Sequence, residues 1–134
     1  MMSKTTTPKV TVILPTYNRA RTISRAILTV LSQSYDDFEL IVVDDASTDD
    51  TEDIVKQIKD PRLVYIKQTV NGGAAATRNA GLRVARGEII AFQDSDDEWM
   101  LDKLEKQVAA FEHYPDAVVV YCGMIYWDGI SPLY

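Results

Sequence analysis

Three carboxylates crowded into one short loop are the residues best placed to do chemistry. Asp94, Asp96 and Asp97 follow the apolar run Ile89–Phe92, in the stretch IIAFQDSDDEW. Such a run predicts a strand buried on both faces, and open α/β sheets bind ligands just beyond the carboxyl ends of their strands. Carboxylates this close repel one another unless a cation joins them, and hard divalent cations prefer oxygen ligands. We therefore expect Asp94 and Asp96 to hold a metal ion that in turn holds a phosphate. The alternative is a solvated acidic turn that caps the next helix.

The composition indicates one globular domain with an ordinary core. The chain has 134 residues, 46% of them hydrophobic and 25% charged. Its net charge of −6 argues against a broad nucleic-acid-binding surface, although a bound metal can still attract phosphate. The single cysteine, Cys122, allows no intrachain disulfide. The sequence contains neither a membrane-spanning run nor the apolar stretch of a signal peptide. A cytoplasmic location is therefore expected, and a longer parent could associate with a membrane through another part.

Strands and helices are predicted to alternate along the chain. β-Branched runs predict strands over residues 10–14, 38–43, 63–66, 89–93 and 117–122, with an extension of the last through 124–127. Apolar residues spaced three and four apart predict helices over residues 22–31, 48–59, 74–85 and 101–113. Ser47 and Asp50 resemble a capping box, and Gly87 is expected to be a left-handed helix cap.

This alternation predicts an α/β fold: an open, doubly wound, mostly parallel sheet with helices on both faces. The domain is expected over residues 9–128, after a disordered lead-in at residues 1–8 and before an irregular end at 129–134. In a parallel sheet the carboxyl ends of the strands meet at one edge. The strands that end near Leu14, Val43 and Gln93 are all followed by polar residues suited to a ligand.

Several common enzyme motifs are missing. The first predicted strand is followed by PTYNRA rather than by the glycines of a dinucleotide fingerprint, and no phosphate-binding P-loop sequence occurs. A single histidine, His113, cannot build a His-rich zinc site. No serine lies in a G-x-S-x-G nucleophile elbow. These absences leave the acidic loop as the centre of any site.

Four signatures occur in the order typical of one family. They are PTYNR after the first strand, VDDxSxD after the second, GxxxxRNxG before the fourth, and DSDDxW after it. With these motifs the stretch Lys9–Asp128 resembles the N-terminal, nucleotide-sugar-binding half of glycosyltransferase family 2. The resemblance implies a GT-A fold and transfer of a sugar from a nucleoside diphosphate, with inversion at the anomeric carbon. A UDP-sugar is the expected donor.

The resemblance places a nucleotide base near the first two loops. Pro15 and Tyr17 would line the base pocket, with Tyr17 offering an aromatic face and a hydroxyl. Asp45 would accept a hydrogen bond from a ring N–H of the base, while Asp44 orients the loop. The alternatives are that Tyr17 packs on its own domain and that the two carboxylates cap the following helix.

The resemblance places the diphosphate and a Mn²⁺ or Mg²⁺ ion near the acidic loop. Asp94-Ser95-Asp96 matches the family's D-x-D motif. Asp96 would contact the metal directly, whereas Asp94 would meet the ribose, or the metal through water. Arg78 would reach the diphosphate or brace the acidic loop, and its alternative is a surface ion pair. Asp97 could cap the following helix.

A catalytic general base cannot be assigned. Family members continue for roughly another half domain, which supplies the acceptor site and an Asp or Glu base. Asp116 and Asp128 are the acidic residues after the fourth predicted helix, and neither is a convincing candidate. Leu101 also stands where the family often has a proline.

Two other functions stay open. The chain could be a truncated or vestigial nucleotide-binding module without transferase activity of its own, or a Mg²⁺-binding receiver-type domain, for which the other signatures would be coincidence. The acceptor is unknown. We also expect an exposed sheet edge around residues 117–127 to favour self-association.

Overall fold

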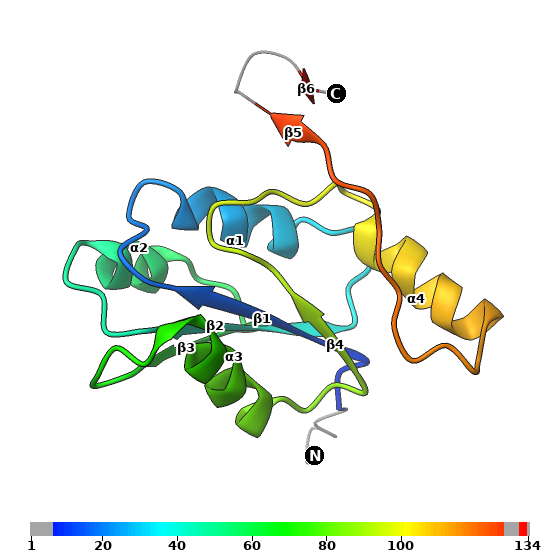
Figure 1. Cartoon of the computed structure of the whole chain (residues 1–134), viewed down its shortest axis with the longest axis horizontal. Coiled ribbons are helices and arrows are strands. Elements are labelled where there is room, and N and C mark those ends of the chain that lie inside the picture. The colour runs from blue at the N-terminus through cyan, green and yellow to red at the C-terminus, as the bar shows by residue number, and fades with distance from the viewer. Residues whose placement is uncertain (1–6, 128–131, 134) are drawn as a thin grey trace.

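The computed structural model describes residues 7–127, 132 and 133. Its centre is a four-stranded parallel sheet in the order β3-β2-β1-β4 (Figure 1). The strands are β1 (Val10–Thr16), β2 (Phe38–Asp44), β3 (Leu63–Lys67) and β4 (Ile89–Phe92). Every pairing in this sheet is parallel. All four carboxyl ends therefore lie at the same edge, as predicted.

Helices cover both faces of this sheet, which confirms the predicted architecture. They are α1 (Ile23–Leu31), α2 (Thr51–Gln57), α3 (Gly73–Val84) and α4 (Lys103–His113). Figure 1 shows α1 and α3 on opposite sides of the sheet. None of the helices in the described part of the chain is long and apolar enough to cross a bilayer.

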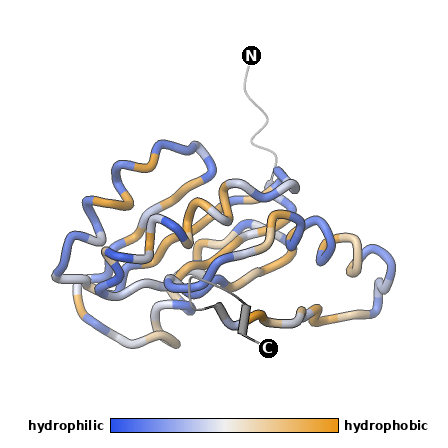
Figure 2. Tube along the Cα trace, turned by 90° about the horizontal axis from the view of Figure 1, so that it is seen from above, coloured by the Kyte–Doolittle hydropathy of each residue, from blue (hydrophilic) through white to orange (hydrophobic). Residues whose placement is uncertain are grey.

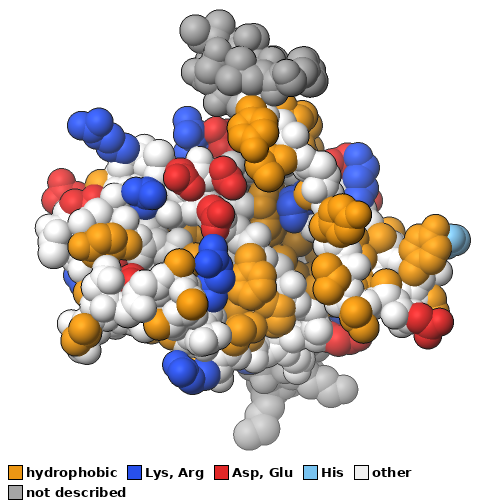
Figure 3. All heavy atoms as spheres, viewed as in Figure 1, with side chains coloured by type: hydrophobic (Ala, Val, Ile, Leu, Met, Phe, Trp, Pro, Cys, Tyr) orange, Lys and Arg blue, Asp and Glu red, His pale blue; other side chains and the backbone are white. Residues whose placement is uncertain are grey.

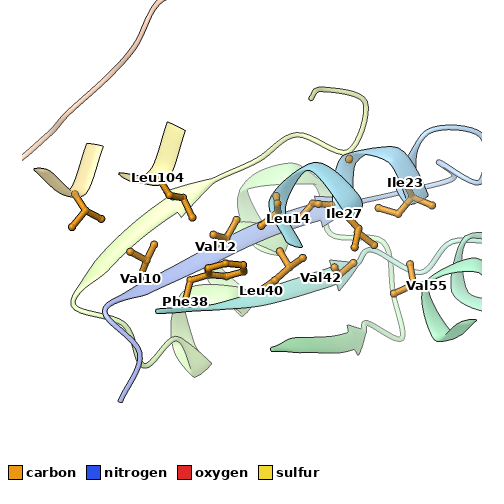
Figure 4. Packing of buried hydrophobic residues seen from close by; sticks show 13 residues of the cluster. Val10, Val12, Leu14, Ile23, Ile27, Phe38, Leu40, Val42, Val55 and Leu104 are labelled. Atoms are coloured by element: carbon orange, nitrogen blue, oxygen red, sulfur yellow. The ribbon is translucent and has the colours of Figure 1, made fainter. Parts of the chain in front are cut away.

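The main core lies between the sheet and helices α1, α2 and α4 (Figure 4). Alternate residues of β1 and β2, such as Val12 and Leu40, point to this side because successive strand residues face opposite ways. They pack against the apolar stripe of α1, which includes Ile27. Each fully buried side chain of this size stabilises the fold by about 1.5–3 kcal/mol.

Strand β1 continues through Pro15, where the sequence predicts its end. The carbonyl of Ile13 accepts the N–H of Gln93, on the β4 side, and the carbonyl of Thr16 accepts the N–H of Asp45, on the β2 side. The backbone N–H and C=O groups of successive strand residues point to the two neighbouring strands in turn. The nitrogen of Pro15 therefore points toward β4, which has already ended at that level. A proline fits there because no N–H is required.

Strand β4 is less buried than predicted. It forms one edge of the sheet, its residues are half-buried, and Phe92 is 46% exposed. The reason is that only β1 pairs with it among the described strands.

The strand predicted over residues 117–122 is absent. This segment is irregular and exposed, with Val118 92% exposed. In Figure 2 it forms part of a largely hydrophobic stretch on the outside of the molecule. Its β-branched residues favour a strand, but β structure also requires a neighbouring strand to pair with. In the extension predicted over residues 124–127 a short strand does form, β5 (Tyr126–Trp127). It pairs with β6 (Pro132–Leu133), which lies in the end expected to be irregular.

Local predictions at helix ends also fail. Gly87 lacks the left-handed backbone of a helix cap. It is small because an added Cβ would lie 2.4 Å from the backbone nitrogen of Thr11. Ser47 caps no helix, since its hydroxyl accepts the N–H of Asn18. Residues 1–6 of the expected lead-in, and Asp128, lie outside the described residues.

Candidate functional site

A pocket of about 540 Å³ lies at the carboxyl edge of the sheet. It is formed by the segments that follow β1, β2, β3 and β4. All seven predicted site residues line it: Pro15, Tyr17, Asp45, Arg78, Asp94, Ser95 and Asp96. Figure 3 shows acidic and basic side chains close together near the loop that follows β4. The predicted convergence of the strand ends is confirmed, while the ligand roles of these residues stay predictions.

Asp45 joins the β2 loop to the start of α3. Its two carboxylate oxygens accept the N–H groups of Gly72 and Gly73, each at 2.8 Å. The carboxylate therefore caps α3, where unpaired N–H groups favour negative charge, rather than the following helix α2. Each oxygen retains a lone pair for a further donor, so the same carboxylate can still bind a base.

Asp44 holds the second loop in place, as predicted. It is fully buried, and one of its oxygens accepts the N–H of Ser47 at 2.7 Å. The other accepts the Tyr65 hydroxyl at 2.6 Å. Burial, together with this bond to Asp44, raises the pKa of Tyr65, so the hydroxyl stays a donor.

Tyr17 and Asn18 shape the loop after β1. Tyr17 is 45% exposed and lines the pocket, so it does not pack into the core of its own domain. Asn18 adopts a left-handed backbone with a φ of 50°, which asparagine tolerates better than most residues. Its side-chain oxygen accepts the N–H of Thr48 at 2.8 Å, which ties the first two loops together. The sequence offers no specific signal for this contact.

Each outer carboxylate of the D-x-D motif faces an arginine. Arg78 Nη2 lies 2.9 Å from Asp94 Oδ1, so Arg78 braces the acidic loop. Arg19 Nη2 lies 3.7 Å from Asp96 Oδ2. Ser95, between the two carboxylates, is buried. The structure thus adds Arg19, for which the sequence predicts no role although it ends the PTYNR signature.

Neither Asp97 nor Trp99 lines the pocket. The backbone N–H of Asp97 donates to the carbonyl of Asp94, and the residue does not cap α4, which begins after Asp102. Burial, with the charges of Asp96 and Asp94, raises the pKa of Asp97. Trp99 packs against the core, with the Lys103 ammonium 4.0 Å from its ring centre.

The carboxylates alone do not make a complete metal site. Within the described residues, no group of three His, Cys, Asp or Glu side chains converges on one point. Asp94 and Asp96 do supply the oxygen ligands that Mg²⁺ and Mn²⁺ prefer, and such ions are often held by one or two carboxylates plus substrate phosphates. The residues present therefore fit a metal that arrives with a phosphate ligand.

Thr16 gives a further sign of a ligand in this pocket. It lines the pocket and is only 3% exposed. Within the described part of the chain, its hydroxyl has no hydrogen-bond partner. A buried hydroxyl without a partner costs about 1–3 kcal/mol, and proteins rarely retain one without a reason.

Comparison with known proteins identifies the family. A family model described as "Glycosyl transferase family 2" matches residues 11–131. An Escherichia coli protein, "UDP-Glc:alpha-D-GlcNAc-diphosphoundecaprenol beta-1,3-glucosyltransferase WfaP", is 45% identical over 103 residues. A Bacillus subtilis protein, "Putative teichuronic acid biosynthesis glycosyltransferase TuaG", is 47% identical over 103 residues. These matches cover 77% and 75% of this chain, but only 41% of either relative.

Solved structures agree with the sequence relatives. S. aureus TarS 1–349 in complex with UDP-GlcNAc matches with a TM-score of 0.76 and 34% identity, over 80% of this chain and 32% of that one. The mannosyltransferase PcManGT from Pyrobaculum calidifontis, in complex with GDP-Man and Mn²⁺, matches with a TM-score of 0.73 and 37% identity, over 80% of this chain and 33% of that one. With its GT-A sheet and its four signatures, the chain belongs to glycosyl transferase family 2.

Proposed function

We propose that this chain forms the donor-binding part of a glycosyltransferase. It binds a nucleoside-diphosphate sugar, with UDP as the nucleotide, together with Mn²⁺ or Mg²⁺. The sugar is then transferred to an acceptor with inversion. The observation that carries this proposal is the pocket itself, since it gathers all seven predicted residues from separate segments of the chain.

The base side of the pocket supports a nucleotide ligand. Tyr17 offers a half-exposed ring on which a base can stack. Asp45 accepts hydrogen bonds only, which suits the ring N–H of uracil. UDP is favoured because TarS binds UDP and UDP-GlcNAc and the E. coli relative is named for UDP-Glc. PcManGT binds GDP-Man, so the family allows other bases and the choice needs a direct test.

The phosphate side of the pocket supports a metal-bound diphosphate. In our proposal Asp96 contacts the ion, Asp94 meets the ribose or a water on the ion, and Arg78 reaches the phosphates. When bound, the ion stabilises the negative charge on the departing nucleoside diphosphate. The protein's own part is to bind the base, orient the diphosphate and place its cationic groups beside it.

In our proposal the acceptor site lies outside this pocket. The described pocket residues provide no general base that we can assign. We propose that this base, and the acceptor site, correspond to the part of the relatives that this chain does not span.

Calorimetry with UDP, GDP and dTDP, each with and without Mn²⁺, tests the proposal. We expect UDP to bind in the presence of Mn²⁺ and to bind at least ten-fold more weakly without it, as is usual for strongly coupled ligands. Binding of GDP alone would correct the base while leaving the family function intact. A lack of binding by all three nucleotides with Mn²⁺ would refute the proposal.

A further inference from the structure

The two arginines that face the D-x-D carboxylates come from different parts of the fold. Arg78 belongs to α3 and pairs with Asp94 at 2.9 Å. Arg19 belongs to the loop between β1 and α1, and its Nη2 lies 3.7 Å from Asp96. Both arginines line the pocket. The two arginines together neutralise the two carboxylates that a bound metal ion would need as ligands.

Arg19 has a fixed backbone and a movable side chain. Its N–H donates to the Thr51 hydroxyl at 2.9 Å, and its carbonyl accepts the N–H groups of Thr22 and Ile23. Its side chain, in contrast, is 47% exposed, and that of Arg78 is 36% exposed. Long, partly solvated side chains exchange rotamers readily. Both guanidinium groups can therefore change partner without disturbing the fold.

A metal ion and these arginines compete for the same carboxylates. A cation that approaches Asp94 and Asp96 meets two positive charges at short range, which opposes its binding. Within the described residues no third carboxylate converges to offset this cost. A diphosphate changes the balance because guanidinium groups bind phosphate oxygens well, often through two parallel hydrogen bonds.

We propose that Arg19 and Arg78 are exchangeable counter-charges. Without nucleotide they pair with Asp96 and Asp94 and suppress metal binding. When the diphosphate enters, they transfer to its oxygens and leave the carboxylates for the metal. This inference rests on the proposed function, and it adds a role for Arg19 and a reason for metal and nucleotide to bind together. By linkage, each ligand then strengthens the other by the same factor.

The test measures Mn²⁺ affinity by electron paramagnetic resonance, without UDP and with saturating UDP, for the wild type, Arg19→Gln and Arg78→Gln. Glutamine removes the charge while keeping a polar side chain. Without UDP, we expect each variant to bind Mn²⁺ about three-fold more tightly, in line with the loss of an exposed ion pair. With UDP, we expect binding about ten-fold weaker, since charge-assisted contacts to the phosphates are lost.

A matched control comes from the helix that follows the Arg19 loop. Arg25 of α1 pairs with Glu98 at 2.8 Å, and neither residue lines the pocket. Arg25→Gln should change neither measurement. Thermal melting checks that the variants fold. The variants Arg19→Lys and Arg78→Lys, which keep the charge but lose the planar fork, should fall between glutamine and the wild type.

The opposite directions of the two changes distinguish exchange from other roles. A purely structural arginine would weaken both measurements, and an arginine that only pairs with its carboxylate would bind no phosphate, so its loss would tighten Mn²⁺ binding both without and with UDP; either result in both variants overturns the exchange. An equal effect of Arg25→Gln would also overturn it, because general charge would then be the cause. If the wild type binds no UDP with Mn²⁺, the proposed function fails and the exchange fails with it. If the wild type binds both ligands but the variants behave like it, the exchange alone fails.

Discussion

At the scale of single residues, Asp45 does two things with one carboxylate. Its oxygens hold Gly72 and Gly73, and thereby fix the start of α3 against the sheet. The same side chain lines the pocket. A helix N-terminus positioned by a pocket residue gives a rigid wall to the site, because the loop cannot move without breaking two charge-assisted hydrogen bonds.

Replacing Asp45 by Asn should test this structural role. Asparagine has one acceptor oxygen, so its NH₂ group would face one of the two glycine N–H groups. We expect Asp45→Asn to lower the free energy of unfolding by about 2 kcal/mol, measured by urea denaturation. Asp50→Asn is the matched control, since Asp50 makes no side-chain capping bond to α2, and should change it by less than about 0.5 kcal/mol. Equal stability of the two variants would contradict the capping role.

Replacing Asp96 by Ala should test the metal assignment. Asp96 is exposed and its nearest arginine is 3.7 Å away, so its removal should not unfold the protein. We expect UDP affinity in Mn²⁺ to fall by at least ten-fold, measured by calorimetry, because a direct ligand of the ion is lost. UDP affinity without metal should not fall and should rise slightly, because Arg19 loses its carboxylate partner and a negative charge beside the phosphates is removed. Wild-type dependence on Mn²⁺ in Asp96→Ala would refute the assignment of this residue.

Much of the site could be predicted from residue type and position. Polar residues after parallel strands must share one edge, which is why Tyr17, Asp45 and Asp94 come together. The pairing of Arg19 with Asp96 could not be predicted, because it depends on the path of the first loop. That path depends on the left-handed backbone of Asn18 and its contacts with the second loop.

At the scale of elements, the sequence pattern is sufficient where a segment has packing partners among the described residues. Strands β1 and β2, and helix α1, match their predicted positions to within one or two residues. Both strands have a neighbouring strand on each side, and α1 buries its apolar stripe in the core, so local propensity and packing agree. The prediction fails for residues 117–122, where propensity favours a strand but none of the described strands pairs with them. Pairing is a property of the fold and cannot be read from one segment.

The close contact between α3 and β1 depends on Gly81. An added Cβ would lie 2.7 Å from Ile13 Cγ2. Alanine normally stabilises a helix relative to glycine by about 0.5–1 kcal/mol, but overpacking a core costs about 1–3 kcal/mol. We therefore expect Gly81→Ala to lower the free energy of unfolding by about 1–2 kcal/mol. Gly123→Ala, with nothing near its Cβ position, is the control. A more stable Gly81→Ala protein would show that the helix can shift at little cost.

An ion pair between buried Glu39 and half-exposed Arg86 joins β2 to the segment between α3 and β4. Glu39 is 4% exposed and accepts hydrogen bonds from Thr11 and from the backbone and side chain of Arg86. Burial would raise the pKa of Glu39, but these hydrogen bonds outweigh it and hold the pKa below its usual value. A lowered pKa means that Glu39 stabilises the fold above its unfolded-state pKa, and that this contribution is lost as the pH falls through the folded-state pKa.

Arg86→Gln should therefore destabilise the protein in a pH-dependent way. At pH 7 the variant must keep a buried carboxylate without its cation. We expect a loss of about 2 kcal/mol, less than for a fully buried pair because Arg86 is half-exposed. The difference from the wild type should shrink below about pH 4.5, where the carboxyl is protonated in the unfolded chain. Urea denaturation at pH 7 and pH 4 measures this difference in the free energy of unfolding. A difference that is equal at both pH values would contradict the role of the Glu39 charge.

At the scale of the whole molecule, the central strands of the sheet differ from its edge strands. Strands β1 and β2 are covered on both faces, whereas β4 is a half-buried edge with an exposed Phe92. The irregular segment after α4 adds more exposed apolar side chains, and Figure 3 shows hydrophobic side chains gathered on this face. Unpaired strand edges and contiguous apolar surface both favour association. We therefore expect self-association through the surface formed by the edge of β4 and the irregular segment after α4, instead of through a strand at residues 117–127.

Self-association should depend on the exposed apolar segment after α4 rather than on non-specific hydrophobic contacts. Val119 and Tyr121 are 72% and 90% exposed, so lysine at both positions removes apolar surface without disturbing the core. We expect the wild type to sediment faster as its concentration rises, and the double variant Val119→Lys/Tyr121→Lys to associate at least ten-fold more weakly, since burying each side chain stabilises by about 1.5–3 kcal/mol. Leu28→Lys, at an exposed apolar position on α1, is the control for added charge and should leave the association of the wild type intact. A wild-type protein that remains a monomer at millimolar concentration in sedimentation velocity would refute the prediction. An equal loss in the control would place the contact elsewhere.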